Sequence, residues 1–286
     1  NNGSSWAAVN NGLANVYVLS LAISDTNIFA GTGGGGVFLS TNNGSSWSAV
    51  NTGLTNTSIQ SLAISGTNIF AGTWNGGVFL STNNGSSWTA VNTGLTNTDV
   101  RSLVISGTNI FAGTNGGGVF LSTNNGSSWI EVNTGLTNGY IKSLVLSGAN
   151  IFAGTNGGGI FLSTDTGSSW SAVNNGLTNT YVNSLAISGV NIFAGTGGGG
   201  VWKRPLSEMT GIVENRDNAY FMLYPNPSSG KFKIEVDNMI TNKINLEIYS
   251  LLGENIYATS IFTQQISNEI DLSTFQEGIY FIKISI

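Results

Sequence analysis

The chain has 286 residues and a formal net charge of −5, and its residues are 40% hydrophobic and only 8% charged. This balance excludes a disordered chain, and 9 scattered basic residues offer no basic patch for nucleic acid or an anionic membrane. Cys and His are absent, which excludes disulfides, thiol catalysis, zinc sites and imidazole acid–base chemistry, so we predict no metal and no cofactor.

The first two thirds of the chain repeat with a period of 41 residues. An eight-residue run, STNNGSSW or STDTGSSW, ends at Trp47, Trp88, Trp129 and Trp170. The unit at 47–87 holds four β-prone runs, WSAV, IQSLAIS, NIFAGT and GVFLS, separated by Gly, Asn, Thr and Ser turns. Four antiparallel strands per unit predict a β-propeller blade. A β-helix is the alternative, although its repeats are usually shorter.

The phase of the repeat predicts an all-β ring of five blades over residues 1–202. The chain opens with NNGSSW, a lone Trp strand at Trp6, and the last unit stops after GGGGVW at Trp202 without one. We predict that the N-terminal strand completes the last blade and closes the ring, because closure removes the open strand edges. A piece of a larger ring is the alternative. The chain lacks an initiator Met and opens inside a repeat, so we expect a cut or processed N-terminus.

The recurring run resembles the Asp-box of sialidase-like (BNR) propellers, Ser-x-Asp-x-Gly-x-Thr-Trp. In that family the box is a turn between the third and fourth strands of a blade, away from the active face, so the resemblance implies a structural role. We place an Asn at the Asp position in three boxes, and only Asp165 keeps the carboxylate. An Asx-turn, a glycine with positive φ and a Trp between blades are the expected features. The structural residues are Asn43, Gly44, Trp47, Asn84, Gly85, Trp88, Asn125, Gly126, Trp129, Asp165, Gly167 and Trp170.

The near-identical repeats differ in three columns. The first column is Tyr17, Ser58, Asp99, Tyr140 and Tyr181. The second, two residues later, is Leu19, Gln60, Arg101, Lys142 and Asn183. The third is Gly33, Trp74, Asn115, Asn156 and Gly197. Alternate turns of an antiparallel blade lie at the same end, which puts all three columns on or near one rim of the ring. The first two columns begin the strand after the long connection, which is the innermost strand in Asp-box propellers.

Aromatic, amide and charged side chains in these columns suit sugar rings or a polar protein surface. Neutral drift at exposed turns is the alternative. We predict that the ligand contacts are Tyr17, Ser58, Gln60, Trp74, Asp99, Arg101, Asn115, Tyr140, Lys142, Asn156, Tyr181 and Asn183.

We predict that the chain is not an enzyme. Sialidases use an Arg triad and a Tyr nucleophile, but Arg101 is the sole Arg of residues 1–202. Glycosidases need two carboxyls about 5 to 9.5 Å apart. The carboxyls of the ring are Asp25, Asp99, Glu131 and Asp165, and only Asp99 is expected near the variable rim.

Composition changes after Trp202. Residues 203–222 are charged and carry Pro205, which predicts a linker, and alternating runs from Leu223 to Ile286 predict a small antiparallel β-sandwich. LYPNPSSGKFKIEV, LEIYSLLGENIY and IDLSTFQEGIYFIKI resemble the type A C-terminal sorting domain of the Bacteroidetes type IX secretion system. Members of that family usually continue past the last match, so we expect a truncated domain here. An ordinary binding sandwich is the alternative.

The resemblance implies that the type IX machinery exports the chain, to the medium or to the outer-membrane surface of a Gram-negative bacterium. No apolar run approaches the roughly 20 residues of a membrane helix. The sequence therefore predicts an exported protein whose propeller face binds a glycan or surface polymer. A protein–protein scaffold, similar to the Asp-box assembly factors of photosynthetic membranes, is the alternative, and a glycoside hydrolase comes third.

Overall fold

The computed structural model describes residues 5–14, 17–210, 221–224, 230–236, 243–250, 254–262, 268–275 and 280–285. The chain divides into two compact units, Asn1–Val213 and Glu214–Ile286, and each is described by itself. Among the described residues, none of the helices has the length and apolar character needed to cross a membrane.

The first unit consists of small antiparallel sheets, one from each repeat, with strand order equal to chain order. The first sheet holds β1 (Val18–Ser24), β2 (Asn27–Thr32), β3 (Gly36–Ser40) and β4 (Ser48–Ala49). The second sheet holds β5 (Ile59–Ser65), β6 (Asn68–Thr73), β7 (Gly77–Ser81) and β8 (Thr89–Ala90). The third sheet holds β9 (Val100–Ser106), β10 (Asn109–Thr114), β11 (Gly118–Ser122) and β12 (Ile130–Glu131). The fourth sheet holds β13 (Ile141–Ser147), β14 (Asn150–Thr155), β15 (Gly159–Ser163) and β16 (Ser171–Ala172). The last sheet has three strands, β17 (Val182–Ser188), β18 (Asn191–Thr196) and β19 (Gly200–Pro205). These sheets are the predicted propeller blades.

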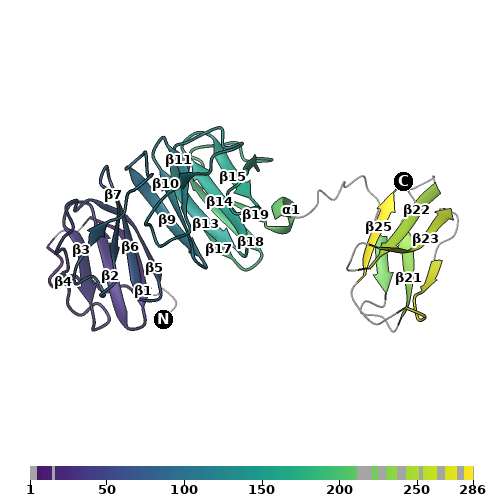
Figure 1. Ribbon diagram of the computed structural model, residues 1–286, viewed down its shortest axis with the longest axis horizontal. Coiled ribbons are helices and arrows are strands. Elements are labelled where there is room, and N and C mark those ends of the chain that lie inside the picture. The colour runs from purple at the N-terminus through teal and green to yellow at the C-terminus, as the bar shows by residue number, and fades with distance from the viewer. Residues whose placement is uncertain are drawn as a thin grey trace. The chain divides into compact units, whose positions relative to one another are not determined.

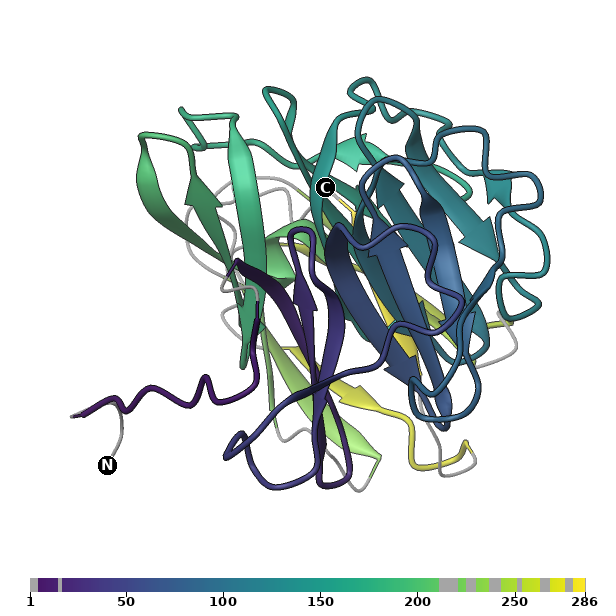
Figure 2. The same cartoon turned by 90° about the vertical axis from the view of Figure 1, so that its left-hand side faces the viewer.

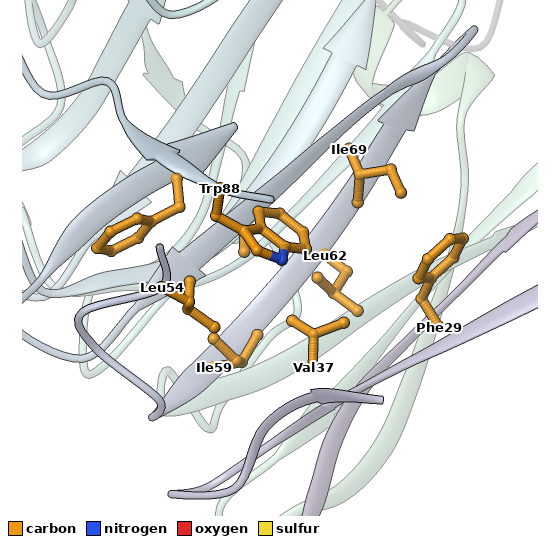
Figure 3. Close-up of a cluster of buried hydrophobic side chains, with 9 residues drawn as sticks. Phe29, Val37, Leu54, Ile59, Leu62, Ile69 and Trp88 are labelled. Atoms are coloured by element: carbon orange, nitrogen blue, oxygen red, sulfur yellow. The ribbon is translucent and has the colours of Figure 1, made fainter. Parts of the chain in front are cut away.

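The core of the first unit lies between neighbouring blades. Figure 3 shows one such cluster, in which Phe29 and Val37 of the first blade pack against Ile59, Leu62 and Trp88. Equivalent clusters lie between the following pairs of blades. Burying one such aliphatic or aromatic side chain contributes about 1.5–3 kcal/mol, so adjacent blades stabilise one another and the box Trp fills the space between them, as predicted.

The blades follow one another along an open arc, from β1–β4 to β17–β19 (Figures 1 and 2). Ser5–Asn10 form no strand, and the Trp6 side chain is 92% exposed. The prediction that the N-terminal strand completes the last blade is therefore wrong for this structure. The carbonyls of Val9 and Asn11 accept hydrogen bonds from Trp47, at 2.7 and 2.8 Å, which fasten this segment to the first blade. Trp88, Trp129 and Trp170 make the same contacts at the later steps between blades. The first and last blades stand apart in Figure 1.

The first unit extends past residue 202, where we predicted its end. β19 runs to Pro205 and is followed by a helical turn, α1 (Ser207–Thr210). Leu206 and Met209 pack against the buried cluster of the last blade, so this part of the predicted linker belongs to the propeller unit. Residues 211–220 of that linker lie outside the described residues.

The second unit contains two three-stranded antiparallel sheets, ordered β20-β21-β24 and β23-β22-β25. Their bounds are β20 (Phe221–Tyr224), β21 (Lys231–Val236), β22 (Lys243–Tyr249), β23 (Asn255–Phe262), β24 (Asn268–Asp271) and β25 (Phe281–Ser285). Phe232 and Ile270 of one sheet pack with Leu246 and Ile248 of the other, so the core lies between the sheets, as predicted for a sandwich. Residues 225–229, within the first sorting motif, lie outside the described residues.

Candidate ligand-binding rim

The three variable columns lie side by side along one rim of the arc. Within a blade, the third-column N–H donates to the first-column carbonyl, for example Trp74 to Ser58 at 3.0 Å and Asn115 to Asp99 at 2.9 Å. Between blades, antiparallel bridges link the third column of one blade to the first column of the next, as in Asn115 and Tyr140. Equivalent bridges join Gly33 to Ser58 and Asn156 to Tyr181, so the variable residues form a ladder that links most neighbouring blades.

Side chains from outside the variable columns hold the backbone of this ladder. The Asn56 amide donates to the Trp74 carbonyl at 2.8 Å and accepts from the Ser58 N–H at 3.0 Å. The equivalent residues Asn97, Asn138 and Asn179 make the same pair of bonds in the later blades. Sequence reasoning missed these clamps, although the unvarying Asn of the LTN run was a usable signal. The rim side chains can therefore change without loss of the backbone geometry.

The second column has its own geometry, because each of its members is the extra residue of a β-bulge. The register of β5 on β6 skips Gln60, and the register of β9 on β10 skips Arg101. A bulge leaves one residue without a partner and turns its side chain. The bulges bring Gln60 and Arg101 of adjacent blades into contact, with the Arg101 Nη1 donating to the Gln60 Oε1 at 3.1 Å.

A polar network joins members of all three columns. The Arg101 Nε lies 2.7 Å from the Asp99 Oδ1, and its Nη2 donates to the Asp99 Oδ2 at 2.8 Å. The Asn115 amide donates to the same carboxylate oxygen at 2.9 Å. Asp99 is buried, so its charge is balanced locally by the guanidinium and held in one orientation.

A pocket of about 470 Å³ lies beside this network. It is lined by Trp74, Asn75, Thr96, Asn97, Thr98, Asp99 and Asn115. Trp74, Asp99 and Asn115 were predicted as site residues, and the structure brings them together. The other four lining residues were missed. Asn75 could have been found, because it alone carries a side chain where the other repeats have Gly, and its φ of 61° is unusual for such a residue.

The remaining predicted contacts lie on the ladder outside this pocket. Tyr140 and Tyr181 are about half exposed, and their rings lie over Gly116 and Gly157 in the turn of the preceding blade. A Cβ on Gly116 would stand 3.5 Å from the Tyr140 ring, so the glycine turn serves as its support. The others sit further along the ladder or beside the network: Tyr17, Ser58, Lys142, Asn156 and Asn183.

The carboxylates of the blades are dispersed. Asp25 sits in the β1–β2 turn and Asp165 in a box turn, while the Glu131 carboxylate of β12 accepts a hydrogen bond from Thr96 at 2.8 Å. Only Asp99 lines the pocket. Within the part of the chain that the structure describes, no group of three or more carboxylates could hold a metal ion.

The box turns lie at the opposite ends of the strands. The Ser40 hydroxyl accepts from the Gly44 N–H at 2.8 Å, and the Asn42 Oδ1 accepts from the Ser46 N–H at 2.9 Å. Asn42, Asn83 and Asn124 therefore hold the Asp position, and our placement of Asn43, Asn84 and Asn125 there is wrong by one residue. Those three have φ near +55° and shape the turn before the glycine instead.

Asp165 is the one carboxylate at the corrected position. Its oxygens accept from the Ser169 hydroxyl at 2.6 Å and the Ser169 N–H at 2.9 Å. These bonds, with one from the Ser163 hydroxyl, hold the pKa of Asp165 below its ordinary value. The glycine and Trp assignments of the boxes agree with the structure, since Gly44, Gly85, Gly126 and Gly167 all have φ between 81° and 86°.

Residues 222–286 match the secretion system C-terminal sorting domain family. Among solved structures, the GH74 enzyme of Niastella koreensis has a TM-score of 0.53 and 23% identity, covering 73% of this chain and 33% of its own. The GH74 xyloglucanase of Xanthomonas campestris has a TM-score of 0.55 and 15% identity, covering 81% and 43%. YCF48 bound to D1 peptide has a TM-score of 0.57 and 13% identity, covering 79% and 77%. These similarities establish the propeller fold alone.

The chain thus spans about a third of the length of the Niastella enzyme. A comparison with curated proteins found no match. The chain is a β-propeller protein that carries a type IX secretion sorting domain and is secreted or held at the outer-membrane surface.

Proposed function

We propose that the variable rim binds a carbohydrate, a glycan or other polymer met outside the cell. The observation that carries this proposal is that the residues that hold the rim backbone are not the residues whose side chains the rim presents. The backbone of the ladder is held by unvarying Asn residues, as at Asn56 and Asn97, while the side chains it presents change from blade to blade. A surface built this way can acquire a specific ligand without altering its fold.

The pocket beside Trp74 has the composition of a sugar site. One side is an indole that is about half exposed, and the rest is amide, hydroxyl and carboxylate. A pyranose has an apolar C–H face that packs on an aromatic ring and hydroxyls that need paired donors and acceptors. The Asn115 amide is bonded to Asp99, and Asp99 is bonded to Arg101, so the polar side of the pocket is pre-organised.

Tyr140 and Tyr181 extend the site along the rim. Tyr140 belongs to the fourth blade and Tyr181 to the fifth, whereas Trp74 belongs to the second; each Tyr is supported by a glycine turn and is about half exposed. Aromatic rings spread over several blades match a polymer better than a single sugar. The proposed ligand is therefore an extended chain with one residue in the Trp74 pocket.

The test is a glycan array probed with the full chain. The variants are Trp74→Ala and a triple Trp74→Ala, Tyr140→Ala, Tyr181→Ala, and the matched control is Ile130→Ala, which removes an exposed apolar side chain from the outer strand β12. We expect Trp74→Ala to weaken binding at least about tenfold, equivalent to about 1.4 kcal/mol, the triple variant to abolish it, and the control to leave it unchanged. A folded parent that binds no glycan, or a triple variant that binds as the parent does, would contradict the proposal.

We further propose that binding occurs without turnover. Asp99 is the only carboxylate in the pocket and is held in an ion pair with Arg101, whereas retaining and inverting hydrolysis both need two free carboxyls. Any oligosaccharide found on the array should therefore survive prolonged incubation with the chain. New reducing ends that depend on Asp99, scored with Asp99→Asn, would show an enzyme instead.

A protein ligand on the same rim is the alternative. YCF48, which shares the fold, was solved with the D1 peptide bound. If the array is silent, capture of a defined extracellular protein that is lost in the triple variant would favour this second function.

A further inference from the structure

One charged side chain of the variable rim belongs neither to the polar network nor to the Trp74 pocket. Lys142 is the second-column residue of the fourth blade, and it is the extra residue of the β-bulge between Ile141 and Ser143. Its side chain is partly buried. The fourth blade lies between the third and the fifth, so the surroundings of Lys142 do not depend on either end of the chain.

The two preceding blades show where a side chain at this bulge lies. In the second blade the Gln60 amide donates to the first-column hydroxyl at 3.3 Å, and in the third blade Arg101 donates to the carboxylate of Asp99 at 2.8 Å. Both bonds join the second column to the first column of the same blade. The bulge of β13 has the same register as those of β5 and β9, which places Lys142 beside Tyr140.

The groups around Lys142 leave its charge without a partner. Tyr140 presents a ring and a hydroxyl where the third blade has a carboxylate. The Arg101 Nη1 donates to Gln60 of the blade before it at 3.1 Å, and the same relation puts Lys142 next to Arg101, whose guanidinium has no acceptor. Within the residues that the structure describes, the Lys142 ammonium makes no hydrogen bond or ion pair.

This charge is the net charge of the variable rim. The ion pair of the polar network carries no net charge. Asp25 and Asp165 lie in turns at the opposite ends of the strands, and Glu131 lies on the outer strand β12. Lys142 therefore makes the rim positive, although the whole chain has a net charge of −5. A negatively charged ligand group is attracted to this rim and finds a free donor there.

The Tyr140 ring beside Lys142 is fixed and accessible. Its ring is 52% exposed and lies over the Gly116 turn, and its backbone N–H donates to Asn138 at 3.0 Å. The C–H face of a pyranose packs on such a ring, and a carboxylate or sulfate on the same sugar accepts a charge-assisted hydrogen bond from the ammonium. In the fifth blade the equivalent pair is Tyr181 and Asn183, which offers an amide and suits a neutral sugar.

We propose that Tyr140 and Lys142 bind an acidic sugar, one that carries a carboxylate or a sulfate, within the polymer on the rim. This inference rests on the proposed carbohydrate function and narrows its ligand to acidic polysaccharides. Asn115 lines the Trp74 pocket and is bridged to Tyr140. The acidic sugar therefore follows the sugar in the pocket along the rim, and Lys142 determines the specificity for charge.

The test is a glycan array of matched pairs, probed with the full chain at low ionic strength. Uronic acid glycans are paired with their methyl esters, and sulfated glycans with their desulfated forms, so the two sets distinguish a carboxylate from a sulfate. The quantity measured is the ratio of affinities for the acidic and the neutral member of each pair. We expect a ratio of at least about ten for the parent in one of the two sets.

Three variants assign this ratio to one side chain. Lys142→Gln removes the charge but keeps a polar side chain, and it should bring the ratio close to one. Lys142→Arg keeps the charge and should preserve the ratio. Lys203→Gln is the matched control, because it removes the charge of an exposed Lys on β19, outside the rim, and should also preserve the ratio.

Failure of this inference can be told from failure of the proposed function. A parent that binds neutral glycans as tightly as their acidic partners would overturn the acidic position and leave carbohydrate binding intact. A ratio that survives Lys142→Gln would overturn it too, as would a ratio lost equally in Lys203→Gln, which would indicate attraction by overall charge. A folded parent that binds no member of any pair would contradict both this inference and the function on which it rests.

Discussion

The two ends of each blade contrast in how their backbone is held. At the box end, substitution of the side chains would destabilise the fold, because the Ser40 hydroxyl, the Asn42 amide and the Trp47 indole themselves make the hydrogen bonds. At the rim end, the variable residues contribute backbone groups to the ladder, and the clamp comes from Asn56 outside the variable columns. The repeats therefore keep the same residues where side chains make the hydrogen bonds, and they vary where backbone groups make them.

The largest effect should come from a box Trp. Trp129 is buried between blades, and its indole donates to the Val91 carbonyl at 2.7 Å. Trp129→Ala should lower the free energy of unfolding by about 3–5 kcal/mol, measured by denaturant titration followed by circular dichroism. The matched control is Trp74→Ala on the rim, for which we expect a change within about 0.5 kcal/mol. Equal losses in the two variants would remove the contrast between the two ends.

A box Ser should have a smaller effect. The buried Ser122 hydroxyl accepts from the Gly126 N–H and donates to the Asn124 Oδ1, both at 2.9 Å. Ser122→Ala leaves the glycine N–H without its partner and should cost about 1–3 kcal/mol. Ser127→Ala, in the same turn but exposed, is the control and should be nearly neutral. A neutral result for Ser122→Ala would mean that the turn is held by its backbone alone.

A still smaller effect, confined to acid, is expected at the one box with a carboxylate. Hydrogen bonds from Ser169 and Ser163 depress the pKa of Asp165 in the folded chain below 3.8, its ordinary value. Its contribution to stability is therefore complete above about pH 4 and is lost as the pH falls through the lower, folded pKa.

Asp165→Asn makes this box like the other three and should remove that part of the acid sensitivity. We would follow the urea midpoint of both chains from about pH 6 to about pH 2.5. The parent should lose stability relative to the variant only at the acid end. If the urea midpoints of the two chains changed in parallel over the whole range, the hydrogen bonds of the turn would not stabilise the ionised carboxylate.

The repeat period and strand runs were sufficient to predict the blades, because each run alternates apolar residues between recognisable turns. Three sequence motifs were sufficient to predict the sandwich and its role in secretion. Ring closure could not be predicted, because a regular repeat has matching end sequences whether or not its two ends meet. The assignment of Asn43 instead of Asn42 was avoidable, because the spacing Ser-x-Asp-x-Gly, counted from Ser40 to Gly44, places the Asp position at Asn42. The pocket was missed as a unit, because Asn75 and Thr96 come from different blades.

The smallest effect on stability, and the sharpest test of the contrast, is expected at Tyr181. Its ring is about half exposed and lies over Gly157, while its backbone N–H is held by Asn179 at 3.0 Å. Tyr181→Ser should leave the free energy of unfolding within about 0.5 kcal/mol yet weaken glycan binding, because only the side chain faces the ligand. Asn179→Ala is the companion variant. This variant keeps the Tyr181 ring but removes the hydrogen bonds that hold the backbone of the ladder. It should lower the free energy of unfolding by about 1 kcal/mol and weaken binding, because the rim is then less pre-organised. If Tyr181→Ser were the more destabilising of the two, the rim side chains would themselves hold the fold, and their variation could no longer be attributed to ligand choice.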